Sequence, residues 1–112
     1  MKFAALLALV SESFRKGLLM SAELRRFMNE IENFPQIMAY WDFEADGGAE
    51  CHTRDLDDDV DRMSHGNAIM ARFFRAVWTH QNEDFDFIEA CSVLDESNRR
   101  FIINFMERPY WP

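Results

Sequence analysis

The chain lacks most of the sequence features that identify enzymes and membrane proteins. Its longest apolar run, at residues 3–10, is far shorter than the about 20 residues that span a bilayer. The four glycines, at positions 17, 47, 48 and 66, are too few and too scattered to build a phosphate-binding loop. No nucleophile elbow and no His-Glu-x-x-His helix is present. These absences favour a non-enzymatic protein with no cofactor and no catalytic residues.

Targeting and redox signals are equally sparse. Residues 1–10 imitate a signal peptide, but no small-x-small cleavage site follows them. We therefore expect residues 3–19 to form a retained, buried helix in a cytoplasmic protein. Cys51 and Cys91 lie forty residues apart, which is not a zinc-site spacing, and two reduced thiols are expected.

Basic residues are outnumbered, with 12 Lys and Arg against 20 Asp and Glu, a net charge of -8 and a pI of about 4.7. Nucleic acids and anionic membranes are bound chiefly through Lys and Arg, so neither is expected as a direct partner. The 112 residues, 48% of them hydrophobic, suffice for one core, and we predict a single domain over residues 1–112.

The net charge is concentrated between Asp42 and Asp61. This stretch holds nine acids and one base, Arg54, whereas the rest of the chain holds eleven of each. The nine acids are Asp42, Glu44, Asp46, Glu50, Asp55, Asp57, Asp58, Asp59 and Asp61. Such a local field can face a basic partner, bind a cation, or remain a solvated surface, and the sequence leaves all three open.

Apolar residues recur at intervals of three and four along the chain, which predicts helices. The expected helices cover residues 3–19, 22–33, 56–63, 66–80, a short segment ending at 94, and 96–107. The expected N-caps are Ser21, Ser64, Asp84 or Asp86, and Asp95. No alternating strand pattern is identified. We therefore predict an all-α fold, a single compact bundle of five to seven short helices, with an acidic loop or short helix at about 44–63.

Two parts of this prediction are more specific. Residues 36–43 fit a strand or a helix opened by Pro35, and we favour the helix. Asp46-Gly47-Gly48 is expected to form a turn. In the helices, the inward residues are expected to be Phe3, Leu6, Leu7, Val10, Phe14, Leu18, Leu24, Phe27, Met28, Ile31, Ile69, Met70, Phe73, Phe74, Val77, Trp78, Phe87, Ala90, Cys91, Leu94, Phe101, Ile102, Phe105 and Met106.

The segment from Asp55 to Asp61 carries five carboxylates over six residue steps. On a helix it would span roughly 9 Å, about one negative charge per 1.8 Å, close to the about 1.7 Å per charge of duplex DNA. A surface of this density could occupy the basic groove of a nucleic-acid-binding protein. The alternative is a solvated helix start, because carboxylates in a first turn interact favourably with the helix dipole.

Two metal-like patterns in this region are incomplete. Asp42-x-Glu44-x-Asp46-Gly47 matches the start of a calcium-binding EF-hand loop, but Thr53 stands where the bidentate Glu belongs. The Cys51-His52 pair has His65 and His80 only at a distance, which is unlike the paired spacing of zinc sites. No metal is predicted, and a metal-dependent enzyme using Cys51 and His52 is one alternative hypothesis.

Both tyrosines and two of the three tryptophans stand in the pairs Tyr40-Trp41 and Tyr110-Trp111. Aromatic side chains of this kind are common interface anchors, and they also cover small cores. They support a second alternative, a structural or assembly module with an aromatic interface to a partner or to a second copy in a homodimer.

A set of aromatic and capping residues occurs within residues 73–95. It comprises Phe73-Phe74-Arg75-Ala76-Val77-Trp78, then Phe85-Asp86-Phe87 and Val93-Leu94-Asp95. This pattern resembles small uncharacterised helical proteins of bacterial mobile elements, carried by plasmids, phages and integrative elements, although Asn82 lies farther from Trp78 than in that pattern. The resemblance implies no known activity. It does imply that the protein is encoded on a bacterial mobile element. Small acidic proteins of such elements often resemble inhibitors of restriction or CRISPR systems.

The first hypothesis is therefore a non-enzymatic acidic binding protein. In its most specific form it is a nucleic-acid-mimicking inhibitor of a bacterial defence complex, CRISPR or restriction. The aspartates of the segment from Asp55 to Asp61, helped by Asp42, Glu44, Asp46 and Glu50, would contact a basic surface on a protein partner.

Overall fold

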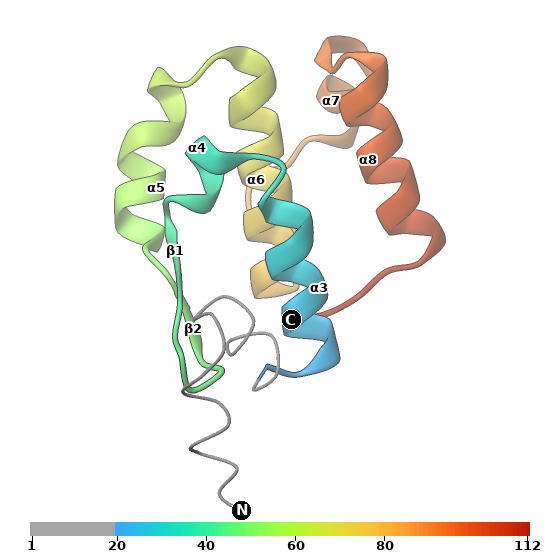
Figure 1. Ribbon diagram of the computed structural model, residues 1–112. Helices are drawn as coiled ribbons and strands as arrows, with labels where there is room; N and C mark the ends of the chain where they lie inside the picture. The colour runs from blue at the N-terminus through green and yellow to red at the C-terminus, as the bar shows by residue number, and fades with distance from the viewer. Residues whose placement is uncertain (1–19) are drawn as a thin grey trace, which may run out of the picture.

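The computed structural model describes residues 20–112, so the helix expected at residues 3–19 lies outside the described residues. The described part is mostly helical and contains a small two-stranded sheet (Figure 1). Its elements are α3 (Ala22–Ile31), α4 (Pro35–Met38), β1 (Trp41–Phe43), β2 (Ala49–Cys51), α5 (Thr53–Asp59), the 3-10 helix η1 (Val60–Arg62), α6 (His65–Thr79), α7 (Phe87–Val93) and α8 (Glu96–Glu107).

Side-chain caps begin four helices where the sequence predicts them. Ser21, Ser64, Asp86 and Asp95 each accept a hydrogen bond from the backbone N–H three residues further on, at 2.8 to 3.3 Å. These bonds satisfy N–H groups that have no partner inside the helix. The predicted starts of α3 and α8 are thus confirmed, α6 begins one residue earlier than predicted, and Asp86 is the cap of α7.

A β-hairpin corrects the all-α prediction. β1 pairs antiparallel with β2, with Trp41 opposite Cys51 and Phe43 opposite Ala49. The helix favoured for residues 36–43 is right only for α4, because the next residues alternate between buried Trp41 and Phe43 and exposed Asp42. The predicted turn after β1 is confirmed, and Gly47 takes a φ of 91° there, which glycine adopts without strain.

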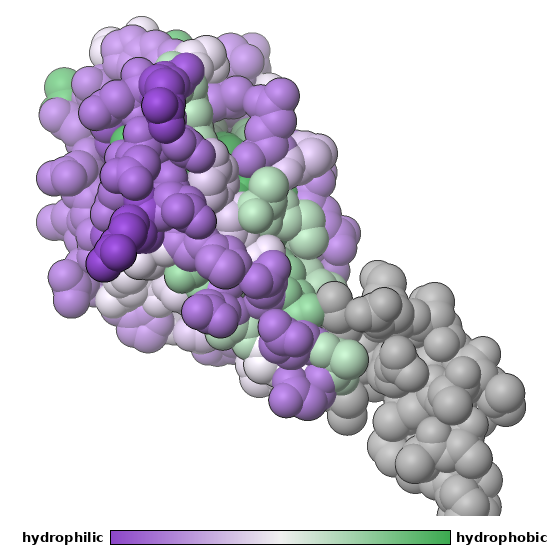
Figure 2. Space-filling model, turned by 90° about the vertical axis from the view of Figure 1, so that its left-hand side faces the viewer, coloured by the Kyte–Doolittle hydropathy of each residue, from purple (hydrophilic) through white to green (hydrophobic). Residues whose placement is uncertain are grey.

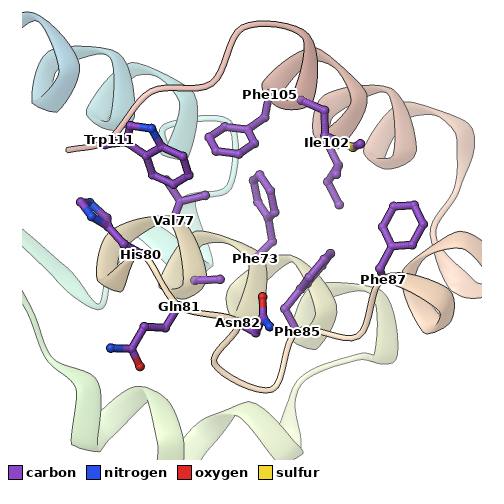
Figure 3. A pocket seen from close by; sticks show the side chains of 12 residues that line it. Phe73, Val77, His80, Gln81, Asn82, Phe85, Phe87, Ile102, Phe105 and Trp111 are labelled. Atoms are coloured by element: carbon purple, nitrogen blue, oxygen red, sulfur yellow. The ribbon is translucent and has the colours of Figure 1, made fainter.

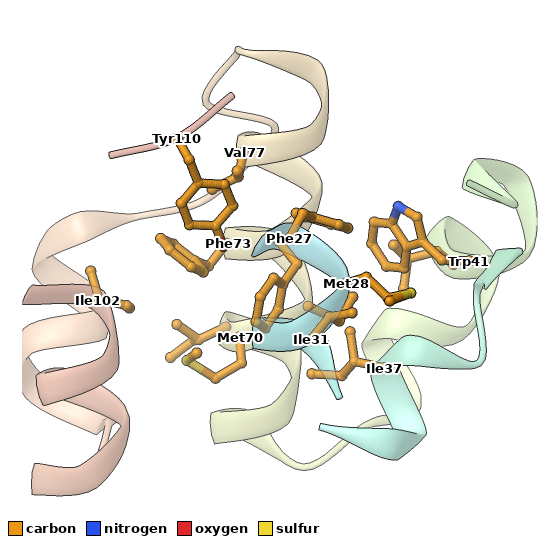
Figure 4. Close-up of a cluster of buried hydrophobic side chains, with 14 of the residues drawn as sticks. Phe27, Met28, Ile31, Ile37, Trp41, Met70, Phe73, Val77, Ile102 and Tyr110 are labelled. Carbon is orange, nitrogen blue, oxygen red and sulfur yellow. The ribbon is translucent and has the colours of Figure 1, made fainter. Parts of the chain in front are cut away.

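The core is built around α6, with α3 and the hairpin packed against it (Figure 1). Phe27 of α3 is 0% exposed and lies in the middle of the buried cluster (Figure 4). Its ring centroid is 5.3 Å from that of Trp78, 5.6 Å from Trp41, 5.9 Å from Phe74 and 6.4 Å from Phe43. Phe27 therefore joins α3, α6 and the hairpin in one aromatic cluster.

The inward stripe predicted for α6 is confirmed, since Ile69, Met70, Phe73, Phe74 and Val77 are all buried. Three inward positions predicted for α7 and α8 are wrong. Phe87 is 52% exposed, Met106 is 60% exposed and Cys91 is also exposed. The two short C-terminal helices cover the core with only part of their apolar surface, because only Ala90, Leu94 and Ile102 on them are buried.

Candidate functional site: the acidic hairpin face

The nine acids of residues 42–61 separate into two groups in the folded chain. One group lies on α5 and η1 and contacts basic side chains that come from elsewhere in the fold or from the next turn. The other lies on the outer face of the hairpin and the adjoining side of α5. The two groups differ in how far nearby arginines offset their charge.

Asp57 and Asp61 belong to the first group because they point toward α6. Asp57 forms an ion pair with Arg75, and Asp61 lies 3.2 Å from Arg72. Arg75 also contacts Glu83 at 3.4 Å, beyond the end of α6. These side chains line a polar cavity of about 280 Å³ between α5 and α6. The arginines of α6 therefore offset the charge of two of the five helix aspartates.

Asp59 is held by a neighbouring pair of donors. The Tyr40 hydroxyl donates a 2.6 Å hydrogen bond to its Oδ2, and Arg62 pairs with its Oδ1. The bond from Tyr40, followed by that from Arg62, lowers the pKa of Asp59 below its ordinary value, and the same bond raises the pKa of Tyr40. Asp59 thus has a structural role, attaching α5 to the chain just before β1.

The second group forms what we call the acidic hairpin face: Asp42, Glu44, Asp46, Glu50, Asp55 and Asp58. Asp42 and Asp46 each have one partner, His52 and the Gly48 N–H respectively. The other four carboxylates have no ion pair or hydrogen bond among the described residues. All six residues are exposed. Figure 2 looks onto the side of the molecule that carries α5 and the hairpin, where hydrophilic residues cover most of the surface.

Strand register explains why the acids of the two strands share one face. Asp42 lies directly opposite Glu50, while the flanking Trp41 and Phe43 point into the core. Like charges directly opposite each other destabilise an antiparallel pair. In the turn, Asp46 Oδ1 accepts a 2.9 Å hydrogen bond from the Gly48 N–H, which holds the loop beside the strands.

His52 sits among the carboxylates of the acidic hairpin face. Its Nε2 lies 2.6 Å from Asp42 Oδ2. The bond to Asp42 and the charge of Asp42, followed by the charges of Glu50 and Asp55, raise the pKa of His52 above its ordinary value. Acids from both strands and from α5 therefore act on one imidazole, which shows that the fold brings them close together.

The predicted absence of a metal site stays a prediction, and neither incomplete pattern gains support. Within residues 20–112, no group of three or more His, Cys, Asp and Glu side chains is placed to hold a metal ion. The EF-hand-like residues lie in the hairpin, and Thr53 begins α5. Burial raises the pKa of the Cys51 thiol to about 11, so it is protonated at neutral pH and a poor nucleophile or ligand.

The two aromatic pairs are mostly buried. Trp41 is 4% exposed and Tyr110 is 3% exposed, with the Arg26 guanidinium 4.4 Å from the centre of the Tyr110 ring. Tyr40 is half-buried and holds Asp59. Of the four residues proposed as an aromatic interface, only Trp111 offers a large exposed surface, at 48%.

No protein family, curated protein or solved structure matches this chain. Among residues 20–112, no helix combines the length and apolar character that crossing a bilayer requires.

Sequence reasoning missed the side chains that divide the acidic segment. Arg72 and Arg75 lie in a different helix from the acids they pair with, so their role needed the packing of α5 on α6. The sequence does contain a pattern from which the hairpin could have been predicted. In residues 41–44 and again in 49–52, apolar and polar residues alternate on either side of the Asp46-Gly47-Gly48 turn, which is the pattern of a half-buried strand pair.

Proposed function

We propose that the protein is a non-enzymatic binding module that contacts a basic surface of a protein partner with its acidic hairpin face. The observation that carries the proposal is the separation of the acids. The acidic hairpin face holds six exposed carboxylates, and Arg54 is the one arginine in that stretch of chain, which leaves a surplus of five negative charges. A surface of one sign steers a basic partner and orients it on contact.

The placement of Asp42 opposite Glu50 supports a role in binding. This pair costs the hairpin stability, and its side chains contribute nothing to the core because both are exposed. The hydrogen bond between His52 and Asp42 and the packing of Trp41 and Phe43 on Phe27 offset that cost. The hairpin is therefore a core-anchored support that presents charge outward.

The fold changes which acids carry the proposed contact. The hypothesis of a nucleic-acid-mimicking inhibitor of a bacterial defence complex rests on the charge density from Asp55 to Asp61. Because Asp57, Asp59 and Asp61 pair with arginines, that density is not presented as a continuous acidic row. We keep a nucleic-acid-binding protein as the proposed class of partner, since its groove is basic, and place the contact on the acidic hairpin face instead.

A fluorescein-labelled deca-arginine peptide serves as a defined basic probe. Its binding to the full chain is measured by fluorescence anisotropy at about 50 mM and about 200 mM NaCl, where a charge-driven contact should weaken steeply. The variant Glu44→Gln/Glu50→Gln/Asp58→Asn removes three charges from the acidic hairpin face without touching a buried side chain. We expect its Kd to rise about tenfold at low salt.

The matched control Glu23→Gln/Glu32→Gln/Glu96→Gln changes the net charge equally, at exposed positions in α3, at its C-cap and in α8. It should bind the peptide nearly as well as the wild type. Equal losses in both triple variants would show that net charge alone attracts the peptide, and would refute a localised binding face.

A further inference from the structure

The large apolar side chains exposed on the described residues all belong to the C-terminal quarter of the chain. They are Phe87, Ile88, Val93, Ile103, Met106 and Trp111, on α7, α8 and the tail, with exposed fractions from 36% to 73%. Contiguous apolar surface on a soluble protein commonly marks an interaction site. This surface is on the side of α6 away from α5 and the hairpin (Figure 1), so it is independent of the acidic hairpin face.

Four of the exposed residues, Phe87, Ile103, Met106 and Trp111, border a mostly apolar groove. A pocket of about 300 Å³ lies between α6, α8 and the tail, and Figure 3 shows Phe105 and Trp111 on one side of it and Phe73 and Val77 on the other. A second, fully apolar pocket of about 200 Å³ lies between α7 and α8. Phe87, Ile102 and Met106 line both pockets, so the two form one groove, which we call the α7–α8 groove.

The charges beside this groove are self-complementary. Arg99, Ile103 and Glu107 follow at intervals of four residues along α8, and therefore lie on one face of the helix. Arg99 and Glu107 are equally far from Ile103, about 6 Å along the axis in opposite directions. When two copies of α8 pack antiparallel about a twofold axis at Ile103, Arg99 of each copy meets Glu107 of the other. Neither Arg99 nor Glu107 has an ion pair within the described residues, although one guanidinium nitrogen of Arg99, Nη1, donates to the Leu94 carbonyl oxygen.

The exposed area is also of the size that a weak dimer requires. The exposed parts of Phe87, Ile103, Met106 and Trp111 amount to roughly 400 Å² per copy, taking about 150–250 Å² for a whole aromatic residue and the lower part of that range for Ile and Met. Two copies together would bury roughly 800 Å² of apolar surface, and because about 60% of a typical interface is apolar, the total with its polar rim would be roughly 1,300 Å², the lower end of specific interfaces. Ile88 and Val93 are left out of this estimate because neither side chain lines the groove.

We propose that the α7–α8 groove is the interface of a symmetric homodimer, in which the occupant is a second copy of this chain. The antiparallel α8 pair forms its centre, with Ile103 packed on Ile103 of the other copy and two Arg99–Glu107 pairs at its ends. Such a dimer directs both acidic hairpin faces outward, so one dimer offers two contacts to a partner.

Sedimentation equilibrium of the full chain from about 1 µM to about 300 µM tests this association, since an interface of this size gives a dimer Kd on the order of micromolar or weaker. The wild type should pass from monomer to dimer across this range. Ile103→Glu should remain monomeric throughout, and circular dichroism should show it folded because Ile103 is already 39% exposed. The matched control Val93→Glu, 36% exposed in the wild type, should associate like the wild type.

Charge reversal tests whether the two α8 helices pack antiparallel in the dimer. Arg99→Glu and Glu107→Arg should each weaken self-association about fivefold to tenfold, because like charges then meet at both ends of the helix pair. An equimolar mixture of the two variants should form a heterodimer about as tight as the wild-type dimer, since each reversed charge meets its complement. A wild-type chain that is monomeric at about 300 µM, equal effects of Ile103→Glu and Val93→Glu, or a mixture no tighter than the single variants would each overturn the proposal.

Discussion

The central position of Phe27 makes Phe27→Ala the sharpest test of how this fold is held together. The ring is 0% exposed and contacts Trp41, Phe43, Phe74 and Trp78. Truncating a buried Phe to Ala costs about 3–5 kcal/mol. Each aromatic pair adds about 0.5–1.5 kcal/mol beyond its buried area, and four lost pairs place the expected loss at the upper end, near 5 kcal/mol.

That loss is comparable with the whole stability of a small protein, which is about 5–15 kcal/mol. At about 4–8 °C per kcal/mol, the melting temperature should fall by about 20 °C or more. Phe27→Leu keeps most of the apolar volume and loses the ring contacts, so it should cost about 1–2 kcal/mol and provide a folded variant for comparison.

Urea denaturation followed by tryptophan fluorescence measures these losses, because Trp41 and Trp78 both contact Phe27. Phe87→Ala is the control, since Phe87 is 52% exposed and should lose only about 1 kcal/mol. Hydrogen exchange adds a local measurement, because loosening of Phe27 should expose amides of residues 41–51 before those of α8. A loss for Phe27→Ala no larger than that for Phe87→Ala, or a hairpin that keeps its full protection in Phe27→Leu, would refute this account of the core.

Two further predictions concern a pH-dependent pair and a helix cap. The pKa of His52 is raised in the fold, so its pair with Asp42 stabilises the hairpin below the ordinary histidine pKa of about 6.5 and loses that effect as the pH rises through the folded-state value. Urea denaturation should therefore find His52→Gln less stable than the wild type at about pH 5.5 and equal to it at about pH 9, and a pH-independent difference would contradict this. Asp95→Ala removes the oxygen that accepts the Asn98 N–H at 2.8 Å and should cost about 1 kcal/mol in thermal denaturation, while Asp95→Asn should retain most of the stability. Equal stability of Asp95→Ala and the wild type would show that the cap contributes nothing.

Local features of the fold could be predicted because their causes lie within a few residues. Ser21, Ser64 and Asp95 cap helices through bonds to N–H groups three positions away, so the pattern is visible in the chain itself. The inward stripe of α6 follows from helical periodicity alone. The hairpin escaped prediction because its two strands are only three residues each, and three residues hold too little alternation to outweigh the helix signal from Pro35.

The sequence by itself determined that nine acids lie between Asp42 and Asp61 and that the helices begin at their caps. Only the tertiary structure decided what those acids do, because their partners come from other elements. Packing of α5 and η1 against α6 pairs Asp57 with Arg75 and Asp61 with Arg72, while strand register brings Asp42 beside Glu50 and His52. The sum of charges is a property of the chain, whereas the field that a partner meets depends on distances across the fold.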